Sequence, residues 1–129
     1  MYPLRLVLFS AATLSIGMPC EAHHSSAMFD AQKSVTLQGT VKSFQWTNPH
    51  CWIQLLVPAA NGVTEWSIEM GSPEQVYRSG WRRSTLPPGA SLTVVIHPVR
   101  DGTSGGQFVS ATAAKGLQPG AADARGRNP

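Results

Sequence analysis

The stretch TEWSIEMGSPEQVYRSGW, from Thr64 to Trp81, decides the fold because it changes from a strand pattern to a helix pattern within a few residues. In its first part Trp66, Ile68 and Met70 alternate with polar residues. This period of two is typical of a strand with one buried face.

The second part of the same stretch carries the start and stop signals of a short helix. Ser72 fits the N-cap and Pro73 fits the first helical position. Gly80 stands where a glycine often follows the last helical turn. The spacing between these signals allows about two turns of helix.

Four further stretches have the alternation or the flanking turn residues of strands: Val35–Trp46, Cys51–Pro58, Ser91–Val99 and Gln107–Ala113. Gly39 predicts a bulge or bend in the first of them. Turns are expected at Thr47–His50 and Ala59–Gly62.

The resulting order is strand, strand, strand, short helix, strand, strand. This order predicts an all-β fold, a small five-stranded OB-like Greek-key barrel with one short helix between the third and fourth strands. Another small β-barrel or a β-sandwich is the alternative. Since side chains fill the interior of so small a barrel, a ligand is expected on an outer face or at the rim.

Residues 1–22 have the layout of a signal peptide. Arg5 precedes an apolar run from Leu6 to Ile16, and the small residue Ala22 stands at a plausible cleavage point. The run is short for a helix that spans a bilayer, so no transmembrane segment is expected after cleavage. An uncleaved membrane anchor is the alternative. Cleavage after Ala22 makes His23 the first residue of a periplasmic or secreted protein.

The length of 129 residues points to one domain, expected over residues 23–115, with a disordered tail over residues 116–129. The formal net charge is +3, but the arginines are scattered, so no nucleic-acid partner is expected. After cleavage Cys51 is the only cysteine, and its apolar neighbours predict a buried core residue.

The sequence contains none of the motifs that mark common catalytic sites, such as G-x-S-x-G, H-E-x-x-H or C-x-x-C. We therefore expect a binding or accessory module and no enzyme. Its partner would be another exported protein or a small ligand.

The histidines suggest one candidate site. A mature N-terminal His23 offers an amine and an imidazole, and His24 adds a third nitrogen, a set that suits copper or zinc. In the expected barrel the end of the fourth strand lies near the start of the first. His97 is therefore the third residue that we expect to ligate the metal, together with His23 and His24. His50 is expected elsewhere, near Glu69. The alternatives are that the N-terminal histidines are merely solvated or pin the N-terminus to the barrel.

The tryptophans suggest a second candidate site. Alternation places Trp52 on the outer face, and Trp81 precedes Arg82, a combination that could stack on a ligand ring or a sugar. The binding-surface candidates are His50, Trp52, Glu69, Trp81 and Arg82. The alternative is that the tryptophans close the ends of the barrel. The domain would then be a structural or protein-interaction barrel without metal.

Four motifs support this organisation as a set: AHHS (Ala22–Ser25), WTNPH (Trp46–His50), EMGSP (Glu69–Pro73) and HPVRDG (His97–Gly102). Together they resemble a family of small exported bacterial proteins of unknown function, over roughly residues 22–115. The resemblance implies export and a compact β-rich fold, and it implies no particular activity.

Overall fold

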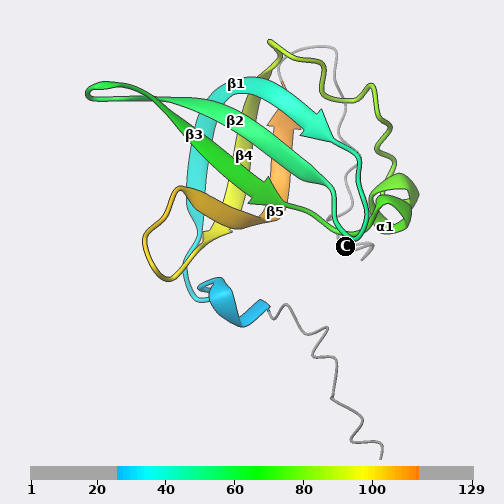
Figure 1. Cartoon of the computed structure of the whole chain (residues 1–129), viewed down its shortest axis with the longest axis horizontal. Coiled ribbons are helices and arrows are strands. Elements are labelled where there is room, and N and C mark those ends of the chain that lie inside the picture. Colours follow the sequence, from blue (N-terminus) through cyan, green and yellow to red (C-terminus); the bar gives the residue numbers. More distant parts are fainter. Residues whose placement is uncertain (1–25, 114–129) are drawn as a thin grey trace, which may run out of the picture.

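The computed structural model describes residues 26–113, which form a closed five-stranded barrel with a short helix between β3 and β4 (Figure 1). The elements are η1 (Ser26–Met28, a 3-10 turn), β1 (Val35–Gln45), β2 (Trp52–Ala59), β3 (Gly62–Glu69), α1 (Pro73–Arg78), β4 (Ser91–Pro98) and β5 (Gly105–Ala113). The predictions about the signal peptide, His23, His24 and the tail lie outside the described residues.

The barrel closes in the order β1-β2-β3-β5-β4, with β4 pairing back to β1. All neighbours are antiparallel except β3 and β5, which are parallel. The first half of β1 pairs with β4 and the second half pairs with β2, so this one long strand belongs to both sides of the barrel. The predicted five-stranded barrel with its helix between β3 and β4 is confirmed, and the sandwich alternative is wrong.

Gly39 lies where β1 passes from β4 to β2. A Cβ at this position would clash with the backbone oxygen of Leu56, so only glycine allows the two strands to approach this closely. The pairing itself is regular at Gly39 and shifts between Val41 and Ser43. The bulge is therefore further along β1 than the sequence predicted.

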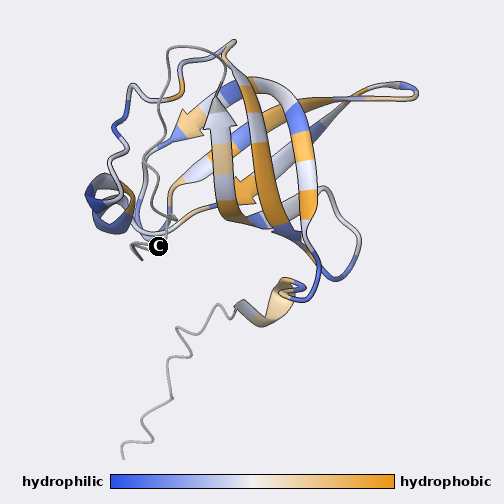
Figure 2. Ribbon diagram, turned by 180° about the vertical axis from the view of Figure 1, so that it is seen from behind, coloured by the Kyte–Doolittle hydropathy of each residue, from blue (hydrophilic) through white to orange (hydrophobic). Residues whose placement is uncertain are grey.

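The inward faces of the strands form one hydrophobic core. Figure 2 shows hydrophobic positions along the strands and mainly hydrophilic ones on α1. Ile53, Leu55, Ile68 and Ile96 are fully buried. Cys51 is fully buried beside them, as predicted. Burial raises the pKa of its thiol, because a thiolate is disfavoured away from water.

Capping interactions set both ends of α1. The Ser72 hydroxyl accepts from the Gln75 N–H at 3.4 Å, and the Gln75 side chain accepts from the Ser72 N–H at 2.9 Å. At the other end Gly80 has a φ of 89°, and the N–H of Trp81 donates to the Val76 carbonyl. This is the Schellman arrangement, which turns the residue after the glycine back towards the helix and, here, into the core.

Candidate functional site

His50 and Glu69 form a close pair at the start of β2 and the end of β3. His50 Nδ1 lies 2.5 Å from Glu69 Oε1, and the Glu69 side chain is only 16% exposed. Since a carboxylate oxygen accepts, the proton between them belongs to His50 Nδ1. Trp52 is the cross-strand neighbour of Glu69 and is half-buried. These positions agree with the predicted proximity of His50 to Glu69 and the predicted outward side of Trp52.

His97 lies near the end of β4, on the outer side opposite the buried Ile96. Its Nδ1 is 2.7 Å from the backbone oxygen of Lys33. A carbonyl oxygen only accepts, so Nδ1 donates and Nε2 of the neutral ring keeps its lone pair. The backbone contact thus fixes both the tautomer and the direction of the imidazole.

The strand pairing places these two histidine environments in one row around the barrel. Gln107 of β5 pairs with Glu69 on one side and with His97 on the other. Two strand spacings give a separation of about 10 Å between the Cα atoms of Glu69 and His97. We call Trp52, Glu69, Gln107 and His97, with His50 on Glu69, the histidine row. His50 and His97 are thus apart, as the sequence predicts, and the pairing through β5, which the sequence did not predict, connects their strands.

Within residues 26–113, no three His, Cys, Asp or Glu side chains are grouped so that they could hold a metal ion. The histidine row therefore offers two oriented imidazoles, and a metal site would need further ligands from outside the described part of the chain.

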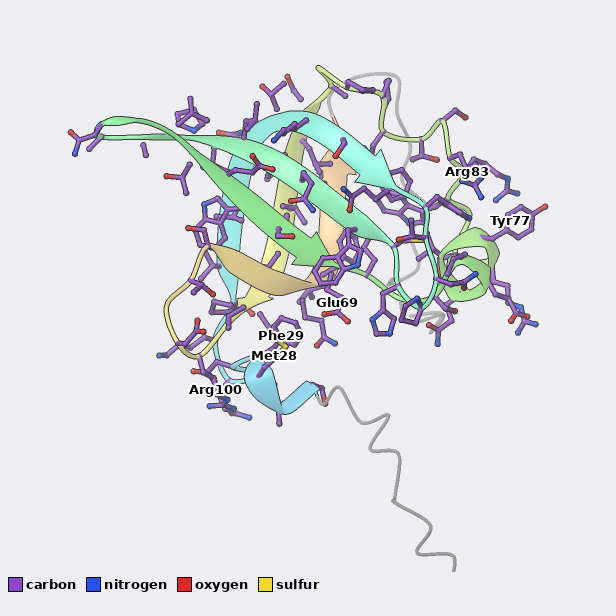
Figure 3. All side chains as sticks on the ribbon, in the orientation of Figure 1. Met28, Phe29, Glu69, Tyr77, Arg83 and Arg100 are labelled. Carbon is purple, nitrogen blue, oxygen red and sulfur yellow. The ribbon has the colours of Figure 1, made fainter. Side chains whose placement is uncertain are left out.

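The segment that follows the N-terminal histidines is bound along the end of β4. Phe29 forms a β-bridge with Val99 and is buried, and the Arg100 N–H donates to the Met28 carbonyl at 2.9 Å. Figure 3 shows Met28, Phe29 and Glu69 at the same end of the barrel. This docking places Ser26, the first described residue, close to the strand that carries His97.

Asp30 holds this segment in place with its side chain. Its carboxylate lies 3.4 Å from Lys33 Nζ and 3.7 Å from Arg100 Nη1, and it accepts the Gln32 N–H at 3.2 Å. Partial burial raises the pKa of Asp30, but the hydrogen bonds and the two cations outweigh it and leave the pKa below its usual value.

Trp81 is not a surface residue, so its prediction as a binding-surface candidate is wrong. Only 1% of the residue is exposed, and its ring packs edge-on against Phe108 and tilted against Phe44. The reason is the Schellman turn at Gly80, which directs the following side chain inward. Trp81 therefore fixes α1 to the barrel and cannot stack on a ligand.

Arg82 is exposed, but it stacks on a residue that the sequence argument did not single out. Its guanidinium lies 4.0 Å from the centre of the Tyr77 ring. The next residue, Arg83, lies 5.8 Å from the centre of the Trp46 ring and donates to the Trp46 carbonyl. Together with Ser84 these residues line a pocket of about 490 Å³, the aromatic–arginine pocket. Figure 3 shows Tyr77 on α1 and Arg83 near it.

The chain belongs to a family of unknown function (DUF6152), whose family model matches residues 12–108. No curated protein and no solved structure matches the chain. In the described residues, no helix is both long and apolar enough to cross a membrane.

Proposed function

We propose that this protein is an exported, non-catalytic binding or accessory module of the periplasm or the extracellular space. The signal-peptide layout of residues 1–22 supports export. The packed interior of the barrel supports binding at the outside, where the histidine row presents oriented polar groups. In this proposal the domain binds its partner through side chains on its outer face and catalyses no reaction.

The proposed ligand is a transition-metal ion, copper or zinc, which His23, His24 and His97 would hold. The observation that carries this proposal is the bond from His97 Nδ1–H to the Lys33 carbonyl. Histidines that bind metals through one ring nitrogen commonly donate the other to a fixed acceptor, which orients the lone pair and raises its basicity.

The docked N-terminal segment supports the involvement of His23 and His24. Ser26 begins the segment that is hydrogen-bonded to the end of β4, and His24 is two residues before it. In the sequence, only Ser25 separates His24 from Ser26. The amine and imidazole of a mature His23 would complete the set of nitrogen ligands.

The test is a calorimetric titration of Cu²⁺ and Zn²⁺ into the chain that begins at His23. We expect His23→Ala and His97→Ala each to weaken the affinity for the metal ion at least about tenfold, because each removes one of the proposed metal ligands. His50→Ala is the matched control, because it removes the other oriented imidazole of the row. Unchanged affinity in both His23→Ala and His97→Ala would end the metal proposal and favour a protein-interaction barrel.

A further inference from the structure

The aromatic–arginine pocket is a second site, independent of the histidines. It lies between the C-terminal end of α1, the turn that follows it and Trp46 at the end of β1. Its volume of about 490 Å³ lies within the usual range of small-molecule sites. Its lining combines two aromatic rings with two guanidinium groups, so it offers both an apolar surface and positive charge.

Among residues 26–113, no carboxylate neutralises the positive charge of this pocket. The ion pairs among residues 26–113 use Lys33, Lys42, His50, Arg78 and Arg100 as cations. Neither Arg82 nor Arg83 pairs with a carboxylate there, and no acidic residue lines the pocket. The charge of the pocket therefore favours an anion.

Backbone contacts hold both guanidinium groups at the pocket. Arg82 Nη1 donates to the carbonyls of Trp81 at 2.7 Å and Tyr77 at 3.1 Å. Arg83 Nη1 donates to the Trp46 carbonyl at 3.4 Å. These bonds use one terminal nitrogen of each group, and the planar guanidinium keeps other N–H donors for a carboxylate or phosphate.

The aromatic rings define the rest of the ligand. Arg82 covers one face of the Tyr77 ring at 4.0 Å, whereas Arg83 is further from the Trp46 ring, at 5.8 Å. Trp46 is half-buried and braced edge-on by Phe44, which keeps its ring in a fixed position. A flat apolar group can pack on these rings while its anionic group meets the guanidinium donors.

We propose that the aromatic–arginine pocket binds a small anion that carries a flat apolar ring, in the class of aryl carboxylates and aryl phosphates. The shared chemistry is one ring next to one anionic group. The pocket uses no residue of the histidine row. A negative result for one of the two proposed sites would therefore leave the proposal for the other unchanged.

The experiment follows backbone amide NMR shifts of the chain that begins at His23 during titration with 2-naphthoate and with 2-naphthyl phosphate. Comparing these two probes shows which anion is preferred. We expect shifts around Trp46, Tyr77 and Arg83, and at least about tenfold weaker binding of the uncharged probe 2-naphthylmethanol. Added salt should weaken binding of both anions, because it screens the exposed guanidinium groups.

Arg83→Gln tests the site, and Arg78→Gln is its matched control. Both arginines are exposed, but Arg78 pairs with Glu74 and does not line the pocket. We expect Arg83→Gln to weaken anion binding about tenfold and Arg78→Gln to leave it nearly unchanged. Equal loss in both variants would show a general charge effect and overturn the proposal. The proposal would also be overturned if the uncharged probe bound as tightly as the anions, or if neither anion shifted the amide signals around the pocket.

Discussion

Replacement of Trp81 by alanine tests how the helix is joined to the barrel. The ring of Trp81 is almost wholly buried between Phe44 and Phe108, and its backbone completes the Schellman turn of α1. Removal of a buried tryptophan side chain typically costs about 3–5 kcal/mol. In a domain of this size we expect the melting temperature to fall by roughly 20 °C, at about 4–8 °C for each kcal/mol.

Trp81→Phe should behave differently from Trp81→Ala. The indole Nε1 is buried and has no hydrogen-bond partner among residues 26–113. An unpaired buried donor costs about 1–3 kcal/mol, and phenylalanine removes it while keeping an aromatic ring. This gain offsets part of the lost packing, so we expect Trp81→Phe to cost less than about 2 kcal/mol.

The assay is urea unfolding followed by far-UV circular dichroism, with the free energy of unfolding compared among the variants. Trp52→Ala serves as the control, since Trp52 is half-buried on the outer side of β2 and should cost less than Trp81→Ala. If Trp81→Phe destabilised the domain as much as Trp81→Ala, the argument from the unpaired Nε1 would be refuted. If Trp81→Ala cost less than about 1 kcal/mol, Trp81 would not join α1 to the core.

Three further predictions follow from single contacts. Gly39→Ala should lower the free energy of unfolding by about 2 kcal/mol or more, because the new Cβ would clash with the Leu56 backbone oxygen. Differential scanning calorimetry measures the effect, and an unchanged melting temperature would contradict this prediction. The Cys51 thiol, which is buried and has a raised pKa, should react with a thiol reagent only as fast as the domain unfolds. Because the pKa of the Asp30 carboxyl is lowered in the folded protein, the ionised side chain stabilises the docked N-terminal segment at pH values above the ordinary aspartate pKa. This contribution is lost as the pH falls through the pKa that Asp30 has in the folded protein. Protection of the Arg100 amide against exchange, taken relative to its intrinsic rate at each pH, should then fall at acidic pH in the natural chain, whereas Asp30→Asn should lack this extra loss of protection.

Much of the fold follows from local sequence signals. The two-residue alternation of each strand and the capping residues Ser72 and Gly80 act over a few positions, so the order of elements and the helix were predictable. Closure into a barrel followed from that order, because the helix after the third strand is typical of one kind of five-stranded barrel.

Most contacts at the candidate sites depend on tertiary packing, which local sequence patterns do not encode. Trp81 was misjudged because the Schellman turn reverses its direction, although Gly80 was the signal that could have shown it. The pairing of Gln107 with both Glu69 and His97 depends on the shear of the closed barrel. Tyr77 entered the pocket through tertiary packing of the helix end, which sequence spacing does not specify.

The most direct test of the proposed function compares Cu²⁺ affinity of two chains that differ only at the N-terminus. Both begin at His23, and one of them has its terminal amine acetylated. Acetylation removes the amine as a donor, keeps both N-terminal imidazoles and leaves the barrel unchanged. We predict that the chain with the free amine binds Cu²⁺ at least about tenfold more tightly. Equal affinities would contradict a metal site built on the mature N-terminal histidine.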